Sequence, residues 1–175
     1  MGDRACNVLF LCTGNSARSI IAESLMNALG DGRFRGYSAG SHPGGKANPL
    51  VLDFLRANGI PADTARSKSW DEFAAPGSPR MDLVITVCDQ AASESCPVWP
   101  GHPAQAHWSA PDPASHMDDP AKAMQVIANV FALMRRRIEA LTSLPMDDLE
   151  PRALQRHAQA IAEKTRADDP SSHRR

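Results

Sequence analysis

The sequence predicts a single-domain α/β fold built on a mainly parallel sheet. Two predominantly apolar runs, residues 7–11 and 83–87, are typical of strands buried on both faces of such a sheet. Helical patterns alternate with them, beginning with an amphipathic stretch over residues 19–29. This alternation favours parallel pairing with right-handed crossovers. The length of 175 residues fits one domain with a full core.

The next elements are expected in chain order. A second strand is predicted over residues 33–39, after a cluster of glycines. A helix is predicted over residues 49–58, because Asn48 is a suitable N-cap, a proline fits the first position and Gly59 follows the end. Residues 69–73 predict a short capped helical turn.

The C-terminal half is expected to be mostly helical. Residues 89–103 contain three prolines and predict an irregular segment, whereas residues 120–141 predict a long amphipathic helix. Residues 146–167 predict a C-terminal helical extension beyond a main domain of residues 1–145, and residues 168–175 predict a disordered tail.

Composition and charge exclude several classes of protein. Hydrophobic residues make up 42% and charged residues 22%, which is typical of a soluble globular domain. The formal net charge of -1 provides no basic field for nucleic acid or for a membrane surface. No apolar run approaches the roughly 18 residues of a membrane span, and no signal-peptide pattern precedes the first strand. The expected location is the cytoplasm.

The most informative motif lies between the first strand and the first helix. It reads Cys12-Thr13-Gly14-Asn15-Ser16-Ala17-Arg18-Ser19. A loop of this length can turn its N–H groups toward a tetrahedral oxyanion, which the positive end of the next helix also faces. This environment favours the thiolate of Cys12, a candidate nucleophile, and Arg18 can hold two anion oxygens. Gly14 and Asn15 tolerate the positive φ that a tight turn needs.

The motif also has a simpler explanation. A cysteine followed by five residues and an arginine occurs by chance, and a cysteine at a strand end is often a small buried hydrophobic residue. The flanking strand and helix favour a catalytic loop instead. The hydroxyls of Ser16 and Ser19 support this interpretation, because they can donate to the sulfur or to the loop.

The chain has three further cysteines, Cys6, Cys88 and Cys96. In a reducing compartment cysteines are more often free, catalytic or metal-binding than disulfide-bonded. Cys12 and Cys88 both end predicted parallel strands, so we expect both thiols at the sheet edge where ligands bind in such folds. Alternatively, Cys88 is a core residue and Cys96 an incidental surface thiol. Cys6 is expected to be structural or incidental.

No cofactor or metal is predicted. Residues 40–47 nearly spell a nucleotide-binding P-loop, but Ala47 stands where a hydroxyl would hold magnesium. No C-x-x-C pair indicates zinc, and the six histidines show no spacing typical of a metal site.

Together these residues resemble the low-molecular-weight tyrosine phosphatase superfamily, and within it the arsenate reductases that use three cysteines. The resemblance covers residues 7–141. It is carried by residues 12–19, Ala22-Glu23, Tyr37-Ser38-Ala39-Gly40, Val84-Ile85-Thr86-Val87-Cys88, Cys96-Pro97, His107-Trp108 and Asp112-Pro113. It implies a mainly parallel four-stranded sheet flanked by helices.

The resemblance implies a role for each site residue. Cys12 would attack arsenic, Arg18 would bind the oxyanion and Asp112 would protonate the leaving oxygen. Cys88 would then attack the Cys12 sulfur and release arsenite. Cys96 would take over Cys88, and thioredoxin, or glutaredoxin with glutathione, would reduce the Cys88–Cys96 disulfide. The expected ligands are arsenate and its analogues phosphate and sulfate.

Three departures from the family pattern bear on this mechanism. Ala17 stands where some relatives carry another cysteine, and the spacing from Cys88 to Cys96 is one residue longer. Some relatives hold potassium beside the loop with a Ser-Asp pair, which here reads Ser67-Lys68, so that a lysine replaces the aspartate. Either Lys68 or Arg66 stands in for the ion, or Lys68 points to solvent.

Two other functions use the same motif. A low-molecular-weight phosphatase that hydrolyses phosphotyrosine or small phosphoesters would need the nucleophile, Arg18 and Asp112, but not the other two thiols. Residues 114–116, Ala-Ser-His, stand where phosphatases carry aromatic residues that shape a phosphotyrosine pocket, which favours a small inorganic substrate. A non-catalytic anion-binding protein is the third possibility, and the intact nucleophile argues against it.

Overall fold

The computed structural model describes residues 5–62, 65–88, 99, 103–113, 118–145 and 149–165. Within these ranges four strands form one parallel sheet in the order β2-β1-β3-β4. The strands are β1 (Cys6–Cys12), β2 (Phe34–Gly40), β3 (Leu83–Thr86) and β4 (Ala104–His107). The predicted α/β fold with a parallel four-stranded sheet is confirmed.

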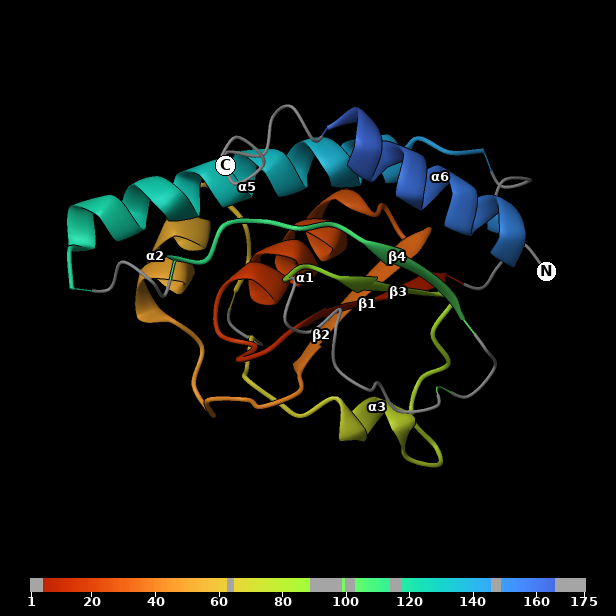
Figure 1. Ribbon diagram of the computed structural model, residues 1–175, viewed down its shortest axis with the longest axis horizontal. Coiled ribbons are helices and arrows are strands. Elements are labelled where there is room, and N and C mark those ends of the chain that lie inside the picture. The colour runs from red at the N-terminus through yellow and green to blue at the C-terminus, as the bar shows by residue number, and fades with distance from the viewer. Residues whose placement is uncertain are drawn as a thin grey trace.

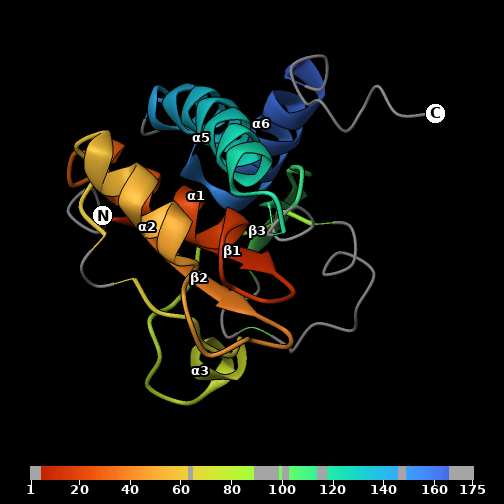
Figure 2. The same cartoon turned by 90° about the vertical axis from the view of Figure 1, so that its left-hand side faces the viewer.

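The helices lie in two layers of unequal size. They are α1 (Arg18–Leu29), α2 (Pro49–Ala57), α3 (Asp71–Ala74), α5 (Pro120–Thr142) and α6 (Pro151–Lys164). Figures 1 and 2 show α1, α2, α5 and α6 gathered on one side of the sheet and the short α3 on the other. The side chains of Asn48, Asp119 and Glu150 accept N–H bonds at the starts of α2, α5 and α6. These caps define where three helices begin.

Alternate residues of β1 supply two separate cores. Val8 and Phe10 face the main helical layer, whereas Leu9 and Leu11 face a smaller cluster that includes Phe73 of α3. All four strand residues are fully buried. Burial on both faces explains why this strand is a continuous apolar run and was predictable from sequence.

The edge strand β4 is the one strand that sequence analysis did not locate. It has only four residues, which alternate between buried and less buried positions. Its outer edge is bonded by α6, because the backbone N–H groups of Gln105 and His107 donate to the side-chain oxygens of Gln155 and Gln159 at 3.1 and 3.3 Å. Most of the irregular segment predicted just before β4 lies outside the described residues.

The opposite edge of the sheet is bonded in a similar way. The side chain of Asn27 on α1 accepts from the N–H of Gly36 in β2 and donates to the carbonyl of the same residue, at 2.8 and 3.1 Å. A side-chain amide therefore stands where a neighbouring strand would pair.

The predicted helical extension contains α6, which packs into the main core. Leu154, Ala158 and Ile161 belong to the same hydrophobic cluster as the residues of β1 and α5. Figure 1 shows α6 beside the end of α5 and over β4. In the described part of the chain, none of the helices is long and apolar enough to cross a bilayer.

Candidate active site

The motif loop connects the end of β1 to the start of α1. Cys12 is the last residue of β1 and is only 3% exposed, and Arg18 opens α1. Ala17 is the N-cap of α1 and has no side chain that could accept a hydrogen bond, unlike the capping residues of α2, α5 and α6. No N-cap side chain therefore bonds to the first N–H groups of α1.

The carbonyl groups of the loop are bonded on its outer side. The donors are the N–H groups of Ser41, His42, Gly44 and Asn48, which bond to the carbonyls of Cys12, Thr13, Gly14 and Ser16 at 3.3, 2.9, 3.1 and 2.9 Å. A trans peptide unit is planar, so its N–H points away from its carbonyl. The N–H groups that follow these carbonyls therefore point inward. One of them, from Asn15, donates to the Cys12 sulfur at 3.2 Å.

Asn15 fixes the shape of the loop. It has a φ of 47°, in the left-handed region that asparagine tolerates better than most residues. Its side-chain oxygen accepts the N–H of Lys68 at 2.8 Å, and its amide donates to the Ser19 hydroxyl at 2.8 Å. Ser19 lies 2.9 Å from the Cys12 sulfur. A thiolate can only accept, so the Ser19 hydroxyl donates to it whenever Cys12 is ionised.

Two further residues support the loop from outside. The hydroxyl of Ser67 donates to the carbonyl of Gly14 at 3.1 Å. A Cβ at Gly40 would lie 2.5 Å from the carbonyl oxygen of Thr13, so only glycine allows the end of β2 to approach the loop. Sequence analysis gave neither residue this role. Gly40 follows the strand predicted over residues 33–39, and Ser67 precedes Lys68 in the pair that matches the family's Ser-Asp pair, but neither signal predicts contact with the loop backbone.

Arg18 and Asp112 meet beside the loop. The Arg18 guanidinium lies 3.4 Å from the Asp112 carboxylate and donates to the carbonyl of Ala110 at 3.2 Å. Its side chain is 14% exposed and that of Asp112 is 40% exposed. The aspartate therefore has access to solvent while the arginine is mostly enclosed. Two residues far apart in the sequence are thus brought into contact.

Burial raises the pKa of the Cys12 thiol, because the enclosed sulfur loses water that would stabilise a thiolate. Hydrogen bonds from Ser19 and the charge of Arg18 act in the opposite direction, and Cys88 adds to the rise. The net direction differs from the sequence expectation of a favoured thiolate. The groups that stabilise the thiolate were visible in the sequence, but the burial of the Cys12 sulfur was not.

Cys88 lies at the same edge of the sheet as Cys12. It follows β3, which pairs in parallel with β1, and its sulfur is 3.4 Å from the hydroxyl of Thr13. Cys6, Cys12 and Cys88 are all free thiols and buried. Cys6 begins β1 and so lies at the opposite end of the strand from Cys12. Cys96, the third thiol of the predicted relay, lies outside the described residues.

Lys68 is directed into the protein rather than toward solvent. Its side chain is 7% exposed, and its ammonium donates to the Ser38 hydroxyl at 3.3 Å and to the Arg66 carbonyl at 2.9 Å. It lies 3.9 Å from the Glu23 carboxylate, which accepts from Ser38 at 2.7 Å. The solvent-facing alternative for Lys68 is therefore wrong. The hypothesis that its ammonium stands in for a potassium ion stays a prediction.

The Glu23–Lys68 pair is electrostatically coupled. Burial raises the pKa of Glu23, and the neighbouring Lys68 lowers it. Burial lowers the pKa of Lys68, and Glu23 raises it. Each of the two charged groups therefore stabilises the charged form of the other inside the protein.

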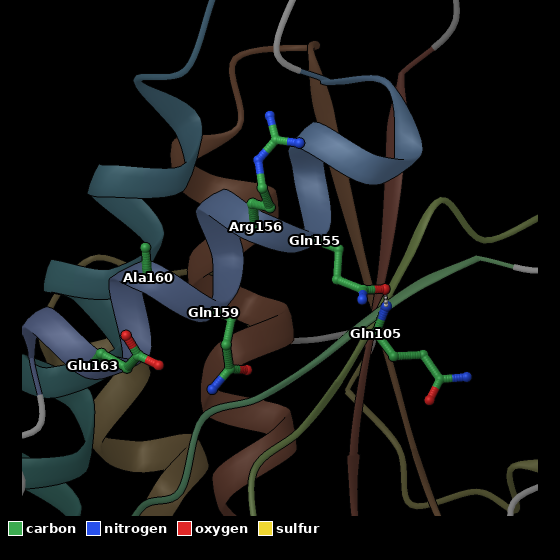
Figure 3. A pocket seen from close by; sticks show the side chains of 6 residues that line it. All are labelled: Gln105, Gln155, Arg156, Gln159, Ala160 and Glu163. Atoms are coloured by element: carbon green, nitrogen blue, oxygen red, sulfur yellow. Dashed lines mark hydrogen bonds between the residues drawn. The ribbon is translucent and has the colours of Figure 1, made fainter.

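A separate pocket of about 410 Å³ lies between β4 and α6. Figure 3 shows its lining side chains, which are Gln105, Gln155, Arg156, Gln159, Ala160 and Glu163. None of them is a predicted site residue. Among the described residues, no group of three or more histidine, cysteine or acidic side chains is arranged to hold a metal ion.

The chain matches a known protein family over a region that contains all the site residues described above. The family model described as low molecular weight phosphotyrosine protein phosphatase matches residues 7–160. The arsenate reductase of Bacillus licheniformis is 37% identical over 130 residues, which cover 74% of this chain and 84% of that protein.

Solved structures show the same fold. The arsenate reductase of Archaeoglobus fulgidus is 28% identical with a TM-score of 0.58, over 75% of this chain and 98% of that one. The thioredoxin-dependent arsenate reductase of Corynebacterium glutamicum is 27% identical with a TM-score of 0.57, over 77% of this chain and 61% of that one.

Proposed function

Because the chain belongs to the low molecular weight phosphotyrosine protein phosphatase family, we propose that its Cys12 loop binds the tetrahedral oxyanion arsenate and that the protein reduces arsenate to arsenite. Relatives and solved structures that carry the name arsenate reductase support this choice of substrate. The inward N–H groups of the loop and the guanidinium of Arg18 are the groups proposed to bind the anion.

The observation that carries the proposal is the second free thiol at the loop. The sulfur of Cys88 lies 3.4 Å from the hydroxyl of Thr13, the residue that follows Cys12 in the sequence. Hydrolysis needs one thiol and water, whereas reduction needs two electrons. A pair of thiols that closes into a disulfide supplies two electrons.

In the first step the Cys12 thiolate attacks As(V). A sulfur–arsenic bond forms and one arsenate oxygen leaves. Asp112 gives its proton to that oxygen, so that it departs as water. Arg18 balances the charge of the remaining oxygens, and its contact with Asp112 supports the choice of that carboxyl as proton donor.

In the second step the Cys88 thiolate attacks the sulfur of Cys12. A Cys12–Cys88 disulfide forms and the sulfur–arsenic bond breaks. Its electron pair stays on arsenic, which becomes As(III), and arsenite takes a proton from water as it leaves. The two thiols are oxidised by two electrons and arsenic is reduced by two.

In the last step Cys96 attacks Cys88, which frees Cys12 and leaves a Cys88–Cys96 disulfide. A dithiol protein of the thioredoxin class then reduces this disulfide. The named thioredoxin dependence of the Corynebacterium relative supports this reductant, with glutaredoxin and glutathione as the alternative. A relay of free thiols requires a reducing compartment, so we place the protein in the cytoplasm.

Turnover of arsenate with thioredoxin, thioredoxin reductase and NADPH tests the proposal, beside a parallel assay with glutaredoxin and glutathione. NADPH oxidation that depends on arsenate, with arsenite as product, is the expected result with thioredoxin. No arsenite in either assay would overturn the function.

The second candidate function is hydrolysis of phosphotyrosine or a small phosphoester. It is favoured by the family model and by the Arg18–Asp112 contact, because a phosphatase uses the same anion loop and proton donor. The two functions differ in their need for Cys88, which gives the experiment that separates them.

A further inference from the structure

Two arginines hold successive carbonyl groups in the segment that leads from β4 to Asp112. Arg18 donates to the carbonyl of Ala110 at 3.2 Å, and Arg137 donates to the carbonyl of Ser109 at 2.9 Å. The Asp112 side chain is 40% exposed, so packing alone does not fix it. The backbone that these two guanidinium groups hold contributes to its place beside Arg18.

Arg137 belongs to α5 and is almost fully buried, at 2% exposure. Its Nε donates to the hydroxyl oxygen of Thr165 at 2.9 Å, at the end of α6. The single hydrogen of that hydroxyl goes to the carbonyl of Ile161 at 2.7 Å, which leaves an oxygen lone pair for Arg137. The planar guanidinium is thus fixed at two points, one on α6 and one on the segment before Asp112.

A second set of bonds ties α6 to the start of the same segment. The indole N–H of the fully buried Trp108 donates to the carbonyl of Ala158 at 2.9 Å. The preceding residue, His107, donates its backbone N–H to Gln159. Figure 3 shows Gln155 and Gln159 extending from α6 toward β4. Helix α6 therefore holds both the strand and the first residues beyond it.

We propose that Arg137 is a positioning residue for Asp112, and that α6 contributes to the active site through Thr165, which orients the Arg137 guanidinium. The inference rests on the proposed role of Asp112 as proton donor. A proton donor must lie within hydrogen-bond reach of the oxygen it protonates, so a displaced backbone lowers the rate without removing the donor. In this proposal the helical extension that follows α5 helps to position the proton donor.

A double-mutant cycle between positions 112 and 137 tests this coupling. The variants Asp112→Asn, Arg137→Met and the combined variant are assayed for arsenate reduction and for hydrolysis of p-nitrophenyl phosphate. Asp112→Asn is expected to lower kcat by about 10²-fold or more, and Arg137→Met by about tenfold. In the Asp112→Asn background, Arg137→Met should change kcat by less than about twofold, because the residue then has no proton donor to position.

Thr165→Val is the milder variant and keeps the inference testable if Arg137→Met does not fold. It removes the acceptor for Arg137 while preserving side-chain shape, and its loss of kcat should likewise vanish in the Asp112→Asn background. Thr142→Val is the matched control. Its hydroxyl bonds to the carbonyl four residues earlier, as that of Thr165 does, but at the end of α5. It should leave kcat unchanged, because its hydroxyl has no bond to Arg137 among those that orient the guanidinium.

The outcomes separate the inference from the proposed function. A loss in Arg137→Met or Thr165→Val that persists undiminished without Asp112, or a folded variant with unchanged kcat, would overturn the positioning role. An Asp112→Asn variant with full activity on both substrates would instead remove the proton donor from the proposed mechanism, and this inference with it.

Discussion

Two opposing effects act on the sulfur of Cys12. Burial raises the pKa of the thiol, whereas Ser19 and Arg18 lower it. The Ser19 oxygen also accepts from Asn15, which orients the hydroxyl toward the sulfur. Reactivity at this residue is therefore set by a few short contacts to a sulfur that is almost fully buried.

The first prediction concerns the nucleophile. Cys12→Ser should lower arsenate reduction and any phosphatase activity by about 10³-fold or more, because an alcohol at neutral pH lacks the nucleophilicity of a thiolate. Arsenite production in multiple turnover is the measurement. Cys6→Ser, at the other end of β1, is the control and should stay active. Substantial arsenite formation by Cys12→Ser would rule out the assignment.

The second prediction concerns pH. The Ser19 hydroxyl stabilises the thiolate, so Ser19→Ala should raise the pKa of Cys12 further and shift the rise of its reactivity to higher pH. At neutral pH, alkylation of Cys12 should slow by about tenfold, the size expected for one hydrogen bond to a charged group. Iodoacetamide labelling at a series of pH values, read by peptide mass spectrometry, measures the shift. Ser24→Ala alters another buried serine of α1 and should not move the profile.

The third prediction separates reduction from hydrolysis. Cys88→Ser should stop multiple-turnover arsenate reduction, because the Cys12–arsenic adduct then has no second thiol to attack it. Hydrolysis of p-nitrophenyl phosphate should fall by less than about threefold, since it uses only water and the groups that bind and protonate the substrate. Parallel loss of both activities would mean that Cys88 is structural and that the reductase mechanism lacks its main support.

At the scale of elements, the strands differ in how well their sequences predict them. β1 and β3 are buried on both faces, so their apolar runs are visible without knowledge of the fold. β4 has polar Gln105 and His107 alternating with alanines, and it is a strand because β3 pairs with one edge and α6 bonds the other. Such a strand depends on partners distant in sequence, which local patterns do not contain.

The same distinction holds within the site. The motif of residues 12–19 is contiguous, and the loop between the first strand and the first helix was predictable for that reason. The inward direction of Lys68 and the support from Ser67 depend on where a distant segment crosses the loop. The raised pKa of the Cys12 thiol likewise follows from how the protein packs around the sulfur, which the motif does not show.

The fourth prediction concerns the pair that joins α1, β2 and the segment before α3. Lys68→Met leaves the buried carboxylate of Glu23 without its partner and should lower the free energy of unfolding by about 3 kcal/mol. The double variant Lys68→Met/Glu23→Gln removes both charges and should recover most of that loss. Urea unfolding of the two variants measures the difference. Equal losses in both would show that the ammonium does not neutralise Glu23.

At the scale of the whole molecule, the proposed relay must deliver a disulfide to an external protein. The fifth prediction is that Cys96→Ser completes one arsenate turnover per protein and then stalls. The product should be a Cys12–Cys88 disulfide held in the buried site, beyond the reach of a thioredoxin-sized reductant. Mass spectrometry of the arsenate-treated variant identifies the bond. Continued turnover with thioredoxin would show that this disulfide is reachable without Cys96, and would remove Cys96 from the relay.

The amide side chains on the two edges of the sheet have a consequence for synthesis of the chain. Asn27 follows β1 closely and can bond to β2 as soon as that strand forms. The glutamines that bond β4 belong to α6, which leaves the ribosome long after the strand does. During that interval the nascent chain exposes an open strand edge, a template for unwanted pairing between molecules. A pause in synthesis between α5 and α6 would therefore lengthen the time during which this edge of the nascent chain is open to such pairing.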